Sequence, residues 1–144
     1  MASDVLPDPG SEFGKRVRAR LRDEQVIWFT TVGADGTPQP NPVWFLWTDP
    51  GTVLIYNMST AARLAHLATN PRVSLNFDGN GQGGDIVVLT GRAEVAPQLP
   101  APHENPDYVA KYGGGMTQVS GNLEAFSAVY SVPVTVQVER VRGN

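Results

Sequence analysis

A junction between a predicted strand and a predicted helix holds the side chains best suited to bind an anion. The segment LIYNMSTAARL places four polar side chains within seven positions, namely Asn57, Ser59, Thr60 and Arg63. Hydroxyl groups, the free N–H groups of a helix start and one guanidinium together make the kind of site that holds a phosphate. An ordinary capped helix with an exposed arginine is the alternative, and these residues alone leave both readings open.

Other constellations lack the partners that their chemistry requires. The chain has no cysteine and two histidines, His66 and His103, neither with a carboxylate at the spacing of metal ligands. Thiolate chemistry is therefore excluded and a metal site is not expected. No G-x-S-x-G motif occurs and the carboxylates are scattered, so neither a serine hydrolase nor a glycosidase is indicated. We name no catalytic residue.

The glycine-rich segment GNGQGG, residues 79–84, matches the pattern G-x-G-x-x-G. That fingerprint needs a helix directly after the loop, so that a pyrophosphate meets the helix N-terminus. A strand pattern follows here instead, which indicates a hairpin loop.

The charge balance argues against polyanionic partners. Eleven Lys and Arg face 14 Asp and Glu, a net charge of -3, which offers no field for nucleic acid or an anionic membrane surface. No apolar run approaches the roughly 20 residues of a membrane span, so a cytoplasmic protein is expected. Five basic residues gather near the N-terminus, where they form either a solvated helix face or a dock for an acidic ligand tail: Lys15, Arg16, Arg18, Arg20 and Arg22.

The hydrophobic periodicity predicts about six strands and few, short helices. Strands are predicted over 25–32, 38–47, 52–57, 72–77, 85–95 and 133–141, and helices over 11–22, 59–70, 105–113 and 122–131. Ser59 or Thr60 is the expected N-cap of the second helix. This pattern favours a mainly β, mostly antiparallel barrel or sandwich. We expect one domain over 1–144, with a helical region over 1–24 and the barrel over 25–144.

The predicted strand PQPNPVWFLW, residues 38–47, begins with three prolines spaced two apart. Residues two apart in a strand share an edge, so Pro38, Pro40 and Pro42 remove three donors from the same edge. The intervening residues can still pair with the preceding strand across the turn GADG. We therefore expect the sheet to part along the proline edge.

The second half of this strand is apolar on both faces. Val43, Phe45 and Trp47 point to one side, while Trp44 and Leu46 point to the other. The barrel interior would cover one face. A second subunit or a flat aromatic ligand is the favoured cover for the other face, and a surface helix is the alternative.

Four segments carry a family resemblance, and together they cover most of residues 25–143: VIWFTTVGADGTPQPNPVWFLW, LIYNMSTAARLAHLATNPRVSLNF, GGDIVVLTGRAEV and YSVPVTVQVERVRG. The chain resembles the pyridoxamine 5'-phosphate oxidase-like (PNPOx-like) superfamily of FMN-binding split β-barrels. More narrowly, it resembles the actinobacterial branch that depends on the deazaflavin coenzyme F420. The resemblance implies a homodimeric split β-barrel with two cofactor sites at the subunit interface.

The same resemblance implies which residues bind the cofactor. The backbone around Asn41, Pro42, Val43 and Trp44 would line the tricyclic ring, and Asn57, Met58, Ser59 and Thr60 would continue that wall. Arg63 would hold the phosphate, at a position where relatives often carry Lys. Asn76, Gly84 and Asp85 would reach the site from the partner chain.

The implied function is an F420-dependent oxidoreductase that transfers hydride to a planar conjugated organic substrate at the dimer interface. An FMN-dependent oxidoreductase on the same scaffold is one alternative, and a non-catalytic flavin- or tetrapyrrole-binding protein is another. True pyridoxamine phosphate oxidases carry a further C-terminal segment with substrate-binding Arg and His residues. This sequence ends at Asn144, so vitamin B6 oxidation is not expected.

Overall fold

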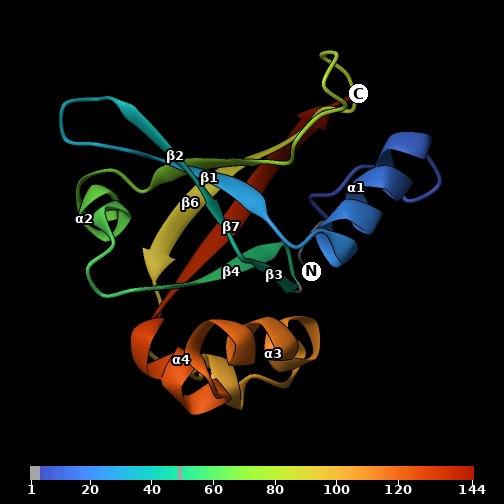
Figure 1. The fold of residues 1–144 in the computed structure, drawn as a ribbon. Coiled ribbons are helices and arrows are strands. Elements are labelled where there is room, and N and C mark those ends of the chain that lie inside the picture. Colours follow the sequence, from blue (N-terminus) through green and yellow to red (C-terminus); the bar gives the residue numbers. More distant parts are fainter. Residues whose placement is uncertain (1–3, 49) are drawn as a thin grey trace.

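A computed structural model describes residues 4–48 and 50–144, and residues 1–3 of the predicted N-terminal region lie outside that description. The described chain forms one antiparallel sheet in the order β2-β1-β5-β6-β7-β4-β3 (Figure 1). Its strands are β1 (Ile27–Val32), β2 (Pro38–Val43), β3 (Leu46–Thr48), β4 (Thr52–Asn57), β5 (Arg72–Asn76), β6 (Val87–Val95) and β7 (Val132–Gly143). Its helices are α1 (Glu12–Asp23), α2 (Ala62–Thr69), η1 (Pro102–Glu104), α3 (Pro106–Ser120) and α4 (Leu123–Val129). The predicted mainly β fold with short helices is confirmed, as a curled half-barrel.

The predicted strand over 38–47 is wrong in one respect, because it is two strands that occupy opposite ends of the sheet. β2 pairs with β1 up to Val43, and β3 pairs with β4 from Leu46 onward. Three residues of chain span at most about 10 Å. The two ends of the sheet therefore meet at this corner, and the sheet must curl. Trp44 and Phe45, between the strands, belong to neither ladder.

The proline edge behaves as predicted. Within the described part of the chain, β2 pairs with β1 alone. The residues of β2 that can exchange hydrogen bonds with β1 are the three non-prolines Val43, Asn41 and Gln39. The prolines alternate with these residues and lie toward the free edge, where the sheet parts.

Two apolar cores lie on the two sides of the β3–β4 pair. The first fills the curl of the sheet and includes Val43, Phe45, Val53 and Ile55, with Trp47 packed against it. The second lies between these strands and the helices α3 and α4, and consists of Leu46, Leu54, Tyr56, Tyr108, Tyr112, Met116 and Phe126, with Trp44 packed against it. The chain's own helices, seen below the sheet in Figure 1, therefore pack on Trp44 and Leu46, which is the alternative of a surface helix as the cover of this face.

α1 confirms its prediction and α2 corrects one. Ser11 caps α1, because its Oγ accepts a hydrogen bond from the Gly14 N–H at 2.9 Å. α2 begins at Ala62 with Ala61 in the cap position and no side-chain cap bond, so the expected cap by Ser59 or Thr60 is wrong.

α3 is longer than the helix predicted over 105–113. It continues through three glycines to Ser120, because Tyr112 and Met116, one turn apart, are both buried in the second core. The loop over 79–84 joins β5 to β6, which pair antiparallel, so the hairpin interpretation of the glycine-rich segment is confirmed.

Candidate functional site

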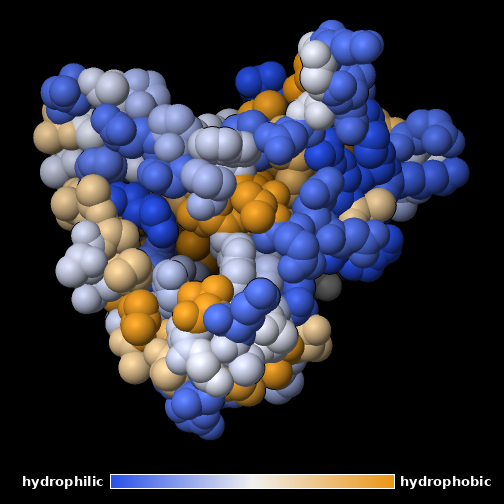
Figure 2. All heavy atoms as spheres, viewed as in Figure 1, coloured by the Kyte–Doolittle hydropathy of each residue, from blue (hydrophilic) through white to orange (hydrophobic). Residues whose placement is uncertain are grey.

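A cavity of 360 Å³ lies where the corner of the sheet meets α3 and α4. Its walls come from the residue before β1, the end of β2 and the link that follows it, β4, α2 and both of these helices. The lining residues are Val26, Pro42, Val43, Trp44, Tyr56, Arg63, Tyr108, Val119, Phe126 and Tyr130. Figure 2 shows apolar atoms gathered in the hollow between the sheet and the two helices. Of the lining side chains, Arg63 alone carries a full charge at neutral pH.

Asn57 holds Arg63 in place. The Arg63 Nε–H donates to Asn57 Oδ1 at 2.6 Å, and Asn57 Nδ2 donates to the carbonyls of Ile55 and Val132 at 3.0 and 3.1 Å. Asn57 is fully buried, so its amide is a fixed support at the end of β4. Because the bond to Asn57 uses Nε, the two terminal nitrogens of the guanidinium have no hydrogen-bond partner among the described residues. They remain available to donate hydrogen bonds to an anion.

The apolar wall is a group of stacked aromatic rings. Trp44 lies parallel to Tyr112 and nearly parallel to Phe126, with ring centroids 4.7 and 5.6 Å apart. Phe126 in turn stacks on Tyr130 at 4.5 Å. Stacked rings of this kind hold each other in fixed planes, so the cavity is bounded by flat, preformed surfaces.

Two side chains of α3 form hydrogen bonds with the backbone N–H and C=O groups of Phe45, where the sheet splits. The N–H of the buried Phe45 donates to the Tyr112 hydroxyl at 2.9 Å, and the Lys111 Nζ donates to the Phe45 carbonyl at 3.0 Å. The Tyr112 hydroxyl has one proton, and Gln25 O lies 2.8 Å from it. The hydroxyl can donate this proton to Gln25 O or to Phe45 O, which lies 2.9 Å away. These bonds replace the ladder bonds that Phe45 lacks.

The pKa values of the lining groups follow from burial. Burial lowers the pKa of Arg63, which nevertheless stays charged at neutral pH, and burial raises the pKa of Tyr56 and of Tyr108. Both phenols therefore remain neutral. A cavity with flat apolar walls and one cation suits a planar ligand that carries an anionic group.

The structure brings together four of the predicted site residues in the cavity wall, Pro42, Val43, Trp44 and Arg63. Asn57 lies behind Arg63 as its support. The remaining predicted residues of this region are exposed and lie outside the lining: Asn41, Met58, Ser59 and Thr60.

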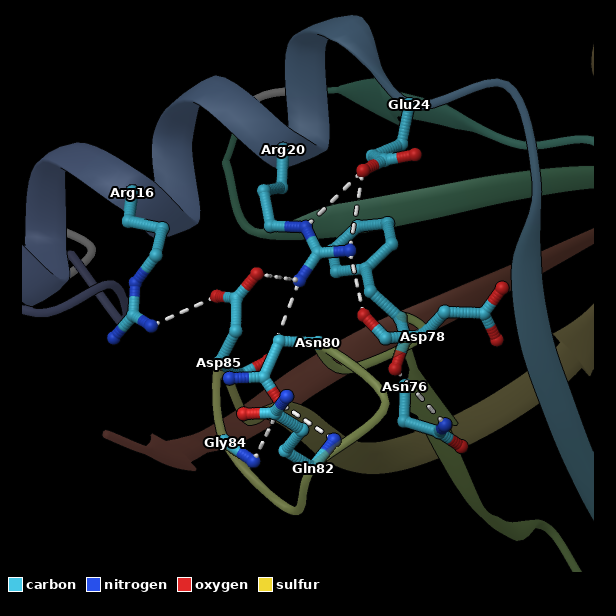
Figure 3. A network of polar contacts seen from close by, with 10 residues as sticks. Arg16, Arg20, Glu24, Asn76, Asp78, Asn80, Gln82, Gly84 and Asp85 are labelled. Atoms are coloured by element: carbon cyan, nitrogen blue, oxygen red, sulfur yellow. Dashed lines mark hydrogen bonds and ion pairs between the residues drawn. The ribbon is translucent and has the colours of Figure 1, made fainter.

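Asn76, Gly84 and Asp85 lie elsewhere, at the β5–β6 hairpin beside α1 (Figure 3). Asp85 forms ion pairs with Arg16 at 2.8 Å and with Arg20 at 3.0 Å. The other basic residues of α1 also have carboxylate partners within the chain, since Arg18 pairs with Asp4, Arg22 with Asp23 and Lys15 with Glu12. The cations of α1 are thus already paired, which argues against a dock for an acidic tail, and Arg20 is too little exposed to belong to a solvated helix face.

Sequence reasoning missed the aromatic side of the cavity. Tyr56, Tyr108, Phe126 and Tyr130 line it, and only their clustering in three dimensions makes them part of the site. The spacing of four between Tyr108, Tyr112 and Met116 was a usable signal, since it marks one buried helix face.

Outside this cavity, the described chain has another hollow, but no cluster of metal ligands and no membrane-spanning helix. A larger hollow of 970 Å³ lies between the segment Asp4–Leu6 and the middle of β7, and none of the predicted site residues lines it. In the part of the chain that the structure describes, no group of three or more His, Asp or Glu side chains is placed to hold a metal ion. No helix among residues 4–48 and 50–144 has the length and apolar character needed to cross a membrane.

Solved structures with this fold were found across several functions. An F420 reductase has a TM-score of 0.69 and 21% identity, with 95% of this chain and 98% of that chain covered. A conserved hypothetical protein from Mycobacterium tuberculosis has a TM-score of 0.67 and 19% identity over 99% and 87% of the two chains. The heme storage protein HutZ from Vibrio cholerae has a TM-score of 0.64 and 14% identity over 90% and 92%. At these identities the likeness concerns the fold.

No protein of curated function matches the sequence. The family model described as pyridoxamine 5'-phosphate oxidase does match, over residues 13–139, which includes all but the first residue of α1, the strands β1 to β6 in full and β7 as far as Glu139. The chain therefore belongs to the pyridoxamine 5'-phosphate oxidase family of split β-barrels, as its sequence segments indicated.

Proposed function

We propose that this protein is an F420-dependent oxidoreductase that acts on a planar conjugated organic substrate. The observation that carries the proposal is Arg63, which lines an aromatic cavity and whose Nε is fixed by Asn57, while its terminal nitrogens have no hydrogen-bond partner among the described residues. Family membership and the likeness to an F420 reductase fold support an oxidoreductase. When bound, reduced F420 supplies the hydride, and the protein supplies position and a dry surface.

The residues present fit such a cofactor. Arg63 would hold its phosphate, and Pro42, Val43 and Trp44 would lie along its ring system. Asn41 and the exposed segment Met58–Thr60 adjoin this wall in sequence and would contact the parts of the cofactor that extend from the cavity. The neutral phenols of Tyr56 and Tyr108 add apolar surface without a competing charge.

We also propose that the site is completed by a second copy of the chain. Asn76, Gly84 and Asp85 are absent from the lining of the cavity within one chain. In a homodimer, the β5–β6 hairpin of the partner would bring these positions to the cofactor.

FMN is the second candidate cofactor, because it also joins a planar tricyclic ring to a phosphate and would use Arg63 in the same way. Tetrapyrrole binding, suggested by the HutZ likeness, has less support at this cavity. Neither histidine lines it: His66 Nδ1 lies 2.8 Å from Thr31 Oγ1, and His103 Nδ1 lies 2.7 Å from Ser127 Oγ.

The test is a titration of the purified protein with F420 and, separately, with FMN, followed by intrinsic tryptophan fluorescence. We expect F420 to bind, and Arg63→Ala to weaken binding by about 1.5–3 kcal/mol, the scale of a hydrogen bond to a charged group. Arg72→Ala is the matched control, because Arg72 is exposed on β5 and lies outside the cavity lining.

Tight FMN binding with no response to F420 would show that the cofactor is FMN and not F420. Equal affinities for Arg63→Ala and the unsubstituted protein would place the phosphate elsewhere. Turnover is tested with reduced F420 and a panel of quinones and enones, and binding without turnover of any of them would favour a non-catalytic binding protein.

A further inference from the structure

We infer that Tyr112 and Gly115 of α3 are positioning residues, which fix the Trp44 indole in the cavity wall and so determine which flat ligands the cavity admits. The inference rests on the proposed function only in taking the cavity as the ligand site. It concerns a part of the chain that the sequence did not associate with binding.

The starting observation is the run of three glycines, Gly113 to Gly115, in the middle of α3. Glycine is the poorest helix former after proline, so a glycine at such a position needs a compensating contact. A Cβ at Gly114 would meet nothing within 4 Å, whereas a Cβ at Gly115 would lie 2.9 Å from Trp44 Cη2 and 3.4 Å from Cζ2. The indole edge thus occupies the space that any side chain at position 115 would need.

Tyr112 holds the same tryptophan from a neighbouring position on the helix. It lies three residues before Gly115, and residues three apart share a helix face. Its ring stacks on the indole, and its hydroxyl accepts a hydrogen bond from the N–H of Phe45, the residue that follows Trp44. α3 therefore controls both the ring of Trp44 and the backbone that carries it.

An added methyl group at position 115 cannot be accommodated without a shift. A Cβ approach of 2.9 Å is shorter than real contacts allow. The indole is also stacked against Tyr112 and Phe126, so it has few directions in which to yield. Because Trp44 lines the cavity, displacing the indole changes the shape of the wall that a planar ligand meets.

The experiment compares Gly115→Ala with the matched variant Gly114→Ala, and adds Tyr112→Phe, which keeps the ring and removes the hydroxyl. The first readout is the near-ultraviolet circular dichroism of the ligand-free protein, with Trp44→Phe used to identify the contribution of Trp44. The second is the dissociation constant of an anilinonaphthalene sulfonate, a flat aromatic anion, measured beside those of F420 and FMN.

We expect Gly114→Ala to raise the melting temperature and to leave the Trp44 spectrum and the sulfonate affinity within twofold of the unsubstituted protein. Gly115→Ala should alter the Trp44 spectrum and change the affinity at least fivefold, and Tyr112→Phe should alter both in the same manner to a smaller extent. Identical behaviour of the two alanine variants overturns the proposal, as does an altered spectrum with unchanged affinity for all three ligands.

Should Gly115→Ala fail to fold, Tyr112→Phe decides alone, and unchanged spectrum and affinity for that variant overturn the proposal. Sulfonate binding that responds to these variants, in a protein that binds neither F420 nor FMN, would refute the proposed function while supporting the positioning roles.

Discussion

The Trp44 indole lies parallel to the Tyr112 ring, with 4.7 Å between the ring centroids and 3° between their planes. Trp44 comes from the two-residue link between β2 and β3, and Tyr112 comes from α3, far along the chain. Because the link belongs to neither strand ladder, its position depends on this helix. The corner at which the barrel splits is thus held by side chains of α3.

Replacing Trp44 therefore tests how much the corner depends on its aromatic contacts. Trp44→Ala should lower the free energy of unfolding by roughly 3 kcal/mol, because the rings of Tyr112 and Phe126 lose their stacking partner and a cavity remains. Trp44→Phe should cost less than half as much, since it keeps a ring in the stack. Urea denaturation followed by far-ultraviolet circular dichroism measures both, and equal losses for the two variants would contradict the stacking argument.

Lys111 should make stability depend on pH. Burial lowers the pKa of Lys111 to about 8 from its ordinary value of 10.5. Between these two values the unfolded chain binds more protons than the folded protein, so stability should rise as pH increases through this window. The rise is at most about 1.4 kcal/mol per pH unit for one group.

The comparison is between the unsubstituted protein and Lys111→Met, which keeps much of the chain length and removes the charge. The difference in unfolding free energy between the two should change steadily from pH 7.5 to 9.5. The titration of the tyrosines lies above this range. Burial raises the pKa of Tyr112 to about 12, so the contribution of the neutral Tyr112 phenol to stability is lost only as the pH rises above the ordinary tyrosine pKa of about 10. Parallel pH profiles for the two proteins would show that Lys111 does not titrate in this window.

Local patterns predicted much of the fold. The spacing of the three prolines indicated a free sheet edge, and the hydrophobic periodicity over 11–22 indicated α1. These features depend on residues that are close in sequence, where backbone geometry and helix periodicity decide the outcome.

The features that were missed depend on distant contacts. Nothing in the residues 38–47 indicates that the strand breaks at Trp44, because the break is stabilised by Tyr112 and Lys111, more than 60 residues later. The continuation of α3 beyond Gly113 is similar, since burial of Met116 outweighs the poor helix propensity of the glycines. In the site, Arg63 was predicted from its local cluster, whereas its support by Asn57 and the aromatic wall required the folded chain.

The prolines of β2 should also protect the sheet from pairing with another molecule. Pro38 and Pro40 remove donors from an edge that is free in the described chain, and proline on an edge strand prevents the addition of a further strand. The double variant Pro38→Thr, Pro40→Thr restores two donors there, and light scattering should detect larger assemblies at concentrations where the unsubstituted protein shows none. Gln39→Thr is the control, since Gln39 lies opposite Thr31 and pairs with β1. Equal association of the control and the double variant would contradict this role.

Asp85 should anchor the β5–β6 hairpin to α1 through charge. Its carboxylate pairs with Arg16 and with Arg20, whose side chain is only 14% exposed, so part of this network is shielded from solvent (Figure 3). Asp85 has a positive φ of 55°, a conformation that aspartate and asparagine both adopt more readily than most other residues with a side chain. Asp85→Asn therefore removes the charge without new backbone strain, and it should cost roughly 1–2 kcal/mol of unfolding free energy. Thermal unfolding in low salt measures this loss. The control is Asp23→Asn, because the ion pair between Asp23 and Arg22 is exposed and should contribute nothing measurable to stability.

A loss for Asp85→Asn no larger than for Asp23→Asn would show that the hairpin is held by other contacts.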